Sequence, residues 1–362
     1  QELKKDIVIA VLDTGIELNH PDLKNNIARN DIECDEGQPQ TTDIKDRDKN
    51  GLPGDCLGWN FIPNEAAADA RPDQMSTNES AQLPQDIEGH GTHVSGIIGV
   101  ETNNGIGLSN STNRIKILPL KVFPKSYLPR TTFRIMINGQ IVNANRTTIL
   151  IQAIDYAIKR KVDIINLSIG WNKNIDSPEL REKIKQAIQS GIIVVAAAGN
   201  DGTEVSTYPC LYEGVLCIGA SDNKNTIAKM SNYGNGVDLV APGVDILSTF
   251  LLNPFHISFL NGYEIYSGTS QAAPYTAKLI GLIKGLNPEI TMTELLQRLY
   301  QTSKPVNLKN EKQFLTAGNI NAQAALDISQ TDLKLKTTII PSFKNLNQLT
   351  LDADRKTTIS IP

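Results

Sequence analysis

The sequence lacks long apolar runs, and it lacks an excess of either charge. A helix needs about 20 consecutive apolar residues to span a bilayer, and no stretch of the 362 residues approaches that length. The formal net charge is -4, with no long run of one sign, whereas nucleic-acid binding requires a basic face. We therefore expect neither a membrane span nor a nucleic-acid partner.

Cysteine is also scarce, with four residues in two local pairs. Four cysteines allow three connectivities. We expect Cys34–Cys56 and Cys210–Cys217, because short loops close at a small entropic cost. Free buried thiols are the alternative. Disulfides would indicate an oxidising compartment.

What the sequence does contain is an alternation of apolar strands and helical patterns. Strands are expected near Ile7–Leu12, Ile115–Val122, Val162–Leu167, Ile192–Ala197 and Val215–Gly219. Helices are expected near Thr92–Val100, Thr148–Arg160, Pro178–Ser190, Ala272–Leu286 and Thr293–Thr302. This alternation predicts an α/β fold with a mostly parallel central sheet covered on both faces. After Asp327 short alternating strands follow, so we expect a first domain over 1–327 and a β-rich tail, or the start of a further module, over 328–362.

Three short motifs carry groups suited to nucleophilic catalysis. Asp13 ends the first apolar strand, His90 lies between two glycines, and Ser270 stands just before a helical run. A serine needs a base to remove its proton, and the base needs a third group to orient it. Taken alone, Ser270 would be interpreted as a helix cap, since small residues before a helix usually have that role. Together the three residues predict an acid, a base and a nucleophile.

The motifs resemble the three signature blocks of the subtilisin-like serine proteases. They are Asp13-Thr14-Gly15, Gly89-His90-Gly91-Thr92-His93 and Gly268-Thr269-Ser270-Gln271-Ala272-Ala273-Pro274, in that order. The resemblance runs from about Lys5 to Asp327 and implies the three-layer αβα fold of that family. It implies a serine endopeptidase acting through an acyl-enzyme intermediate, with Asn200 donating its amide to the oxyanion. A peptide ligase or macrocyclase with the same triad and an inactive scaffold are the alternatives.

The resemblance also places the substrate. Ser168, Ile169 and Gly170 would pair with the substrate backbone, and Ala197, Ala198 and Gly199 would form the facing wall of the pocket. Asp201 could favour a basic substrate residue or be a solvated turn carboxylate.

Two features depart from the family pattern. Gln271 replaces a methionine. An insertion over 124–146 contains a predicted hairpin with an Asn138-Gly139 turn. The hairpin could restrict substrates or be a surface decoration.

Calcium is the expected cofactor, at two sites. Asp46, Asp48, Asn50 and Asp55 form a D-x-D-x-N-G run followed by a carboxylate, a pattern typical of loops that wrap Ca²⁺. A solvated acidic loop is the alternative. The resemblance implies a second site, with side chains of Asp22 and Asn104 and carbonyls of Ile106 and Leu108.

The remaining histidines are expected to be structural or exposed. His90 and His93 are three residues apart, a spacing that disfavours zinc, so His93 is expected to be structural, as is His20. His256 is expected in a surface loop.

The resemblance further implies protein or peptide substrates, a propeptide that inhibits or assists folding, and a secreted or otherwise extracytoplasmic location. Gln1 would then be a processing site or an artificial boundary.

Overall fold

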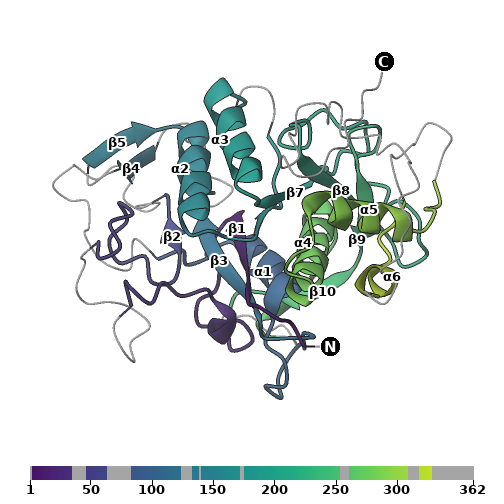
Figure 1. Ribbon diagram of the computed structural model, residues 1–362, viewed down its shortest axis with the longest axis horizontal. Coiled ribbons are helices and arrows are strands. Elements are labelled where there is room, and N and C mark those ends of the chain that lie inside the picture. Colours follow the sequence, from purple (N-terminus) through teal and green to yellow (C-terminus); the bar gives the residue numbers. More distant parts are fainter. Residues whose placement is uncertain are drawn as a thin grey trace.

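A seven-stranded sheet forms the centre of the protein (Figure 1). The computed structural model describes residues 2–34, 46–62, 83–123, 133–137, 140–171, 175–252, 261–308 and 318–327. All six neighbouring strand pairs of this sheet are parallel. The strand order is β2 (Trp59–Asn60), β3 (Ile115–Lys121), β1 (Ile7–Asp13), β6 (Ile164–Leu167), β7 (Ile193–Ala197), β8 (Val215–Ser221) and β9 (Leu239–Pro242).

Helices cover both faces of the sheet, which confirms the predicted three-layer αβα architecture. Side chains of β1 alternate between two cores: Ile7 and Ile9 join one, and Ala10 and Leu12 join the other. The first core also contains residues of α1 (His90–Gly99), α4 (Thr269–Leu286), α5 (Met292–Thr302) and α6 (Ala322–Leu326). The second contains residues of α2 (Arg146–Lys159) and α3 (Pro178–Gln189).

The helix ends follow from local sequence. Ser177 accepts a hydrogen bond from Leu180 N at the start of α3, and Pro178 occupies the first turn. Gly191, with φ of 87°, follows the end of this helix as expected. Thr291 and Glu294 form a reciprocal capping box at the start of α5.

The predicted elements agree with the structure, apart from short strands and some boundaries. The strands and helices expected before residue 328 all exist, although α4 begins at Thr269 rather than Ala272. The strands β2, β9, β10 (Ile246–Thr249) and β11 (Tyr263–Tyr266), and the 3₁₀ turn Lys24–Asn26, were not predicted. The predicted hairpin is confirmed by antiparallel pairing of β4 (Phe133–Ile137) with β5 (Gln140–Ala144). Its Asn138-Gly139 turn, His256 and the tail 328–362 lie outside the described residues.

Both predicted disulfides are present. Cys34 bonds to Cys56 and Cys210 bonds to Cys217, with Cα–Cα distances of 5.0 Å in each pair. The first connects the loop after the 3₁₀ turn to the segment before β2, and the second joins the loop after β7 to β8. In the part of the chain that the structure describes, no helix combines the length and the apolar character of a membrane span.

Candidate active site

Asp13 and His90 meet where the end of β1 faces the start of α1. The Nδ1 of His90 lies 2.7 Å from Oδ1 of Asp13, and the Asp13 side chain is 1% exposed. Oδ1 also accepts a hydrogen bond from Thr14 N at 2.8 Å. Gly89 precedes His90 with φ of 104°, and a Cβ there would collide with the ring of Phe250. The glycine therefore allows Phe250 to pack closely against the start of α1.

Negative charge around His90 sets its protonation. Burial disfavours the charged imidazole, but Asp13, Asp86 and Glu88 outweigh burial and raise the pKa of His90 to about 9. Asp86 is itself buried at the start of α1, where it accepts hydrogen bonds from Gly89 N (3.0 Å) and Thr92 N (2.9 Å). The acidic groups thus favour a positive charge on His90.

Ser270 is the second residue of α4 and forms two hydrogen bonds with Ser168. Its Oγ donates to the Ser168 carbonyl at 2.9 Å, and its own carbonyl accepts from Ser168 Oγ at 2.9 Å. Pro274, four residues later in the helix, has no N–H to offer that carbonyl. Ser270 lies inside the helix rather than at its cap position, which Gly268 occupies.

Asn200 follows β7 and is bound to the residue before the serine. Its Oδ1 accepts hydrogen bonds from Thr269 N at 2.8 Å and from Thr269 Oγ1 at 3.0 Å. Thr269 Oγ1 also accepts from Gly199 N at 3.1 Å. Because Thr269 donates to the Oδ1 of Asn200, the NH₂ group of the same amide points away from Thr269. The four candidate catalytic groups thus come from β1, α1, the end of β7 and α4.

Gln271, the residue that departs from the family pattern, is buried beside this arrangement. It is 2% exposed, and its Nε2 has no hydrogen-bond partner among the described residues. A Cβ at Gly268 would lie 2.9 Å from Gln271 Oε1 and 3.3 Å from Asn200 Nδ2. The two amide side chains therefore flank the same glycine.

The expected substrate segments lie directly after β6 and at the end of β7. Gly170 is exposed, and Ile169 and Gly199 are half-buried. By contrast, Ala197 and Ala198 are buried. The alanines lie behind the surface in this conformation, and Asp201 is exposed.

A segment that the sequence did not single out adjoins them. Tyr208 exchanges backbone hydrogen bonds with Trp171 at 2.7 and 2.8 Å. A Cβ at Gly170 would lie 3.6 Å from Thr207 Oγ1. Thr207 and Tyr208 carry no motif, and only their position shortly before Cys210 could have drawn attention to them.

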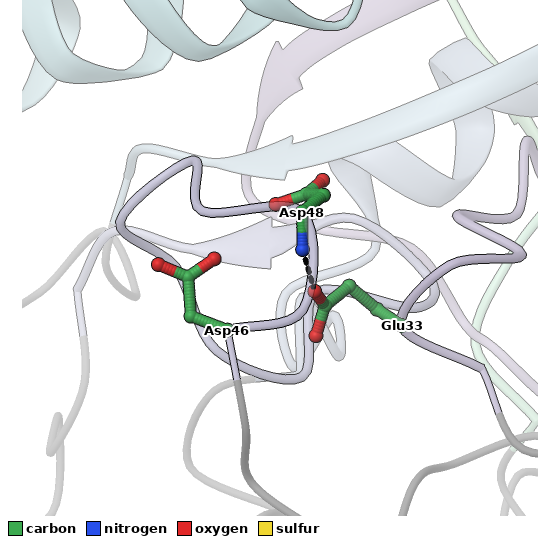
Figure 2. A group of neighbouring side chains, drawn as sticks. All are labelled: Glu33, Asp46 and Asp48. Carbon is green, nitrogen blue, oxygen red and sulfur yellow. Dashed lines mark hydrogen bonds between the residues drawn. The ribbon is translucent and has the colours of Figure 1, made fainter.

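The acidic loop brings three carboxylates together (Figure 2). Carboxylate oxygens of Glu33, Asp46 and Asp48 all lie within 4.8 Å of one another. Glu33 Oε1 accepts a hydrogen bond from Asp48 N at 2.9 Å, which fixes the two chain segments together. Such a group of oxygen ligands suits a hard cation such as Ca²⁺. Glu33 was missed from the sequence, although its neighbour Cys34 pairs with Cys56 close to Asp55.

Asn50 donates hydrogen bonds to both aspartates of this cluster, from its N–H to Asp46 Oδ1 and from Nδ2 to Asp48 Oδ2, each at 2.9 Å, and Asp55 lies beside it. Asp55 is fully buried and accepts hydrogen bonds from Asn30 Nδ2 (2.6 Å), Asn50 Nδ2 (2.8 Å) and Tyr156 OH (2.5 Å). Burial raises the pKa of Asp55, and these donors oppose that effect. The Asp55 carboxylate therefore stabilises the acidic loop through its hydrogen bonds with Asn30 and Asn50.

The residues expected at the second calcium site also lie together. Asp22 is buried, and its carboxylate accepts from Asn104 Nδ2 at 2.6 Å and from Leu108 N at 2.9 Å. Asn104 Oδ1 accepts from Ile106 N at 3.1 Å. A cation here would need the Asn104 amide to turn its oxygen toward Asp22, which would exchange its hydrogen bonds with Asp22 and Ile106 N for the metal contact.

His93 fills a structural position. It is fully buried, and its Nε2 lies 3.1 Å from the carbonyls of both Ile246 and Glu264. It thereby joins β10 and β11 to α1, and burial lowers its pKa to about 4. His20 is also buried, with Nε2 2.8 Å from the Gly262 carbonyl. The Nε2 of His93 thus binds main-chain carbonyls, which is consistent with a structural role.

Several proteins named as serine proteases are similar to this chain in sequence. The "Major intracellular serine protease" of Bacillus subtilis (strain 168) is 31% identical over 314 residues, which cover 84% of this chain and 78% of the relative. The "Thermophilic serine proteinase" of Bacillus sp. (strain AK1) is 30% identical, covering 88% of this chain and 61% of the relative.

A third relative matches a shorter part. The "Minor extracellular protease Epr" of Bacillus subtilis (strain 168) is 34% identical over 216 residues, which cover 59% of this chain and 29% of the relative. The sequence model of the subtilase family matches residues 4–325 of this chain. This chain belongs to the subtilase family.

Proposed function

We propose that this subtilase is a serine endopeptidase that uses Asp13, His90 and Ser270 as its triad and Asn200 as an oxyanion donor. The observation that carries the proposal is the 2.7 Å contact between His90 Nδ1 and Asp13 Oδ1. That contact leaves Nε2 of His90 available as the base and fixes the tautomer that a base requires. Relatives named as serine proteases support the same activity.

The chemistry begins with the Ser270 hydroxyl leaving its resting partner. Its Oγ donates to the Ser168 carbonyl in the free protein, and catalytic hydrogen bonds often tighten only when substrate binds. Rotation of Oγ toward His90 Nε2 allows the proton to move to the imidazole as Oγ attacks the scissile carbonyl. The imidazolium, paired with Asp13, then protonates the leaving amine, and water hydrolyses the resulting acyl-enzyme.

The developing oxyanion has two donors in this scheme. The NH₂ group of Asn200 is oriented by Thr269, which holds the amide oxygen. The backbone N–H of Ser270 belongs to the first turn of α4, where N–H groups have no helical acceptor. Preorganised donors of this kind lower the barrier, and removing one costs about 10²–10³ in kcat.

Labelling with a fluorophosphonate tests the proposal. The protein should be labelled at Ser270 and should hydrolyse a peptide p-nitroanilide, and Ser270→Ala should abolish both. Mass analysis of the peptide products distinguishes hydrolysis from acyl transfer to an amine. A folded wild-type protein that neither labels nor hydrolyses would refute the proposal.

The substrate assignments belong to the same proposal. The substrate backbone would form hydrogen bonds with Ser168, Ile169 and Gly170, which follow β6. Backbone pairing of this kind places little demand on the substrate's sequence. Ala197, Ala198 and Gly199 would line the opposite wall, with the buried alanines behind its surface. Protein or peptide substrates follow from this arrangement, and a propeptide would bind the same edge.

Calcium is proposed as a structural cofactor. Glu33, Asp46 and Asp48 would hold one ion, since three neighbouring carboxylates repel one another without a cation. Asp22 and Asn104, with the carbonyls of Ile106 and Leu108, would hold a second. Calcium would supply charge neutralisation and loop rigidity at both places.

The domain division and the location are proposals as well. We assign residues 1–327 to the catalytic domain and 328–362 to a separate tail. The two disulfides support an extracytoplasmic location, whereas relatives include proteins named intracellular and extracellular. Fractionation of the native host with an antibody to the catalytic domain would decide the location.

A further inference from the structure

Asn232 binds the backbone on both sides of Asn200. It lies between β8 and β9, is 1% exposed, and its Oδ1 accepts hydrogen bonds from Asp201 N at 3.0 Å and Thr203 N at 3.2 Å. Its Nδ2 donates to the Ala198 carbonyl at 3.0 Å. Its own backbone N–H donates to the Gly199 carbonyl at 2.9 Å. One buried side chain therefore spans the turn that carries Asn200.

The fit around this side chain is close. Gly199 has φ of 101°, and a Cβ there would lie 2.5 Å from Asn232 Nδ2. The glycine thus lets the amide approach the turn, and its positive φ directs the chain sharply into Asn200. Movement of the turn away from Asn232 would break these hydrogen bonds, and a side chain at position 199 would prevent the close approach.

Asn232 is in turn attached to the central sheet. Its neighbour Ser231 is fully buried, and Ser231 Oγ accepts from Ala220 N of β8 at 2.9 Å. The same hydroxyl donates to the Asn232 carbonyl at 2.9 Å. A continuous set of hydrogen bonds therefore runs from β8 through Ser231 and Asn232 to the turn.

From these contacts we propose that Asn232 is a positioning residue for the oxyanion donor. Thr269 orients the side chain of Asn200, whereas Asn232 places its Cα. The inference rests on the proposed endopeptidase activity. Only an amide offers an acceptor for two N–H groups and a donor for one carbonyl in the same plane, so neither aspartate nor serine can reproduce the set.

The position of Asn200 affects the transition state selectively. An oxyanion donor acts over about 2.7–3.1 Å from the charge that develops, and a misplacement of about 1 Å can cost about 10²-fold in rate. The charge is absent in bound substrate, so KM should change little. Loss of Asn232 should therefore lower kcat and leave KM nearly constant.

A double-mutant cycle between Asn232 and Asn200 tests the inference. Asn232→Ala should lower kcat for a peptide p-nitroanilide by about 10- to 100-fold, with KM within about threefold. In an Asn200→Ala background the same change should lower kcat by less than about threefold, because the group it positions is gone. Rates are divided by the concentration of sites titrated with fluorophosphonate, so unfolded protein does not contribute.

Two further variants keep the test decisive. Asn232→Asp keeps the acceptor for Asp201 N and Thr203 N but loses the donor to Ala198. It should also lower kcat in the wild-type background and have little effect in the Asn200→Ala background, so it serves in the same cycle if Asn232→Ala does not fold. The matched control is Asn26→Ala, which removes an equally buried amide bonded to the Gly99 carbonyl at 3.0 Å and should leave kcat per titrated site unchanged.

The outcomes separate the inference from the function on which it rests. Equal losses of kcat in the two backgrounds, or a loss explained by KM, would overturn the positioning role while the wild type remained an active endopeptidase. A wild-type protein without hydrolysis would instead refute the proposed function.

Discussion

Ser168 and Ser270 bind each other through two reciprocal hydrogen bonds. Each hydroxyl donates to the carbonyl of the other residue at 2.9 Å. The pair joins the end of β6 to the first turn of α4. It depends on Pro274, because a residue with an N–H at that position would compete for the Ser270 carbonyl.

The first prediction concerns this pair. Ser168→Ala should destabilise the protein by about 1–2 kcal/mol, since the Ser270 carbonyl loses its donor. In a Pro274→Ala background the helical N–H can take that place, so the loss should be smaller. Part of it should remain, because Ser168 Oγ also accepts from Asn166 Nδ2 at 2.9 Å. Urea denaturation of the four proteins measures the coupling, and additive losses would contradict it.

The second prediction concerns activity against pH. The base must be neutral to accept a proton, and the pKa of His90 is raised to about 9. The value of kcat/KM should therefore rise with pH and level off above about pH 9. Glu88→Gln removes one of the negative charges that favour the imidazolium, so the rise should move to lower pH. The exposed Glu289→Gln serves as control, and an equal shift in both variants would contradict the assignment.

The third prediction concerns stability against pH. Burial lowers the pKa of His93 to about 4, while an unfolded histidine titrates near 6.5. Between these values the unfolded state binds more protons, so stability should rise with pH, by up to about 3 kcal/mol. His93→Gln should flatten this dependence in urea titrations of a Ser270→Ala background. Some slope should persist, because burial also lowers the pKa of His20.

The sign reverses at higher pH. His90 binds its proton more tightly in the folded state, so its contribution to stability is present below pH 6.5 and is lost as the pH rises toward 9. A stability that kept rising from pH 6.5 to 9 in wild type would argue against the raised pKa.

The fourth prediction concerns the disulfides. The Cys34–Cys56 bond closes a loop with a separation of 22 residues, and the Cys210–Cys217 bond one of 7. In the chain-entropy description they stabilise by about 3.4 and about 2.4 kcal/mol. Paired Cys→Ala variants, measured by urea denaturation, should each lose stability, and dithiothreitol should then act only on the bond that remains. A wild type unaffected by dithiothreitol after unfolding and refolding would contradict this.

The fifth prediction concerns calcium. Excess EDTA should lower the thermal midpoint of Ser270→Ala protein, since a ligand at 100 times its Kd stabilises by about 2.7 kcal/mol. Asp46→Asn combined with Asp48→Asn should remove most of the EDTA effect at the first site, and Asp22→Asn the effect at the second. Asp31→Asn changes an exposed carboxylate near the same loop and should respond to EDTA as the parent does. An unchanged midpoint of the parent in EDTA would exclude both sites.

The sheet and its long helices were predictable because their patterns are local. Runs such as Ile7–Leu12 are apolar at every position, as strands buried on both faces must be. The strand β2 has two residues and β9 to β11 have four each, too few for a clear pattern, and their pairing depends on neighbours that the fold provides. Sequence periodicity cannot detect an element whose stability comes from its partners.

The candidate site divides in the same way. Asp13, His90 and Ser270 stand in motifs, whereas Glu33 and Asn232 act through spatial neighbours far along the chain. Glu33 meets Asp46 and Asp48 only after the loop folds back, which the Cys34–Cys56 bond stabilises. Asn232 binds backbone atoms of residues 198–203. Every residue has the same backbone groups, so the sequence does not indicate such contacts. Groups that recognise main chain are therefore the ones most easily missed.

The order of the candidate catalytic groups along the chain has a further consequence. α4, which carries Ser270, packs against β1, the strand that carries Asp13. A chain is synthesised from its N-terminus, so the nucleophile emerges from the ribosome last and docks on the strand that emerged first. A nascent chain that does not yet include α4 lacks the candidate nucleophile, so we expect it to have no proteolytic activity.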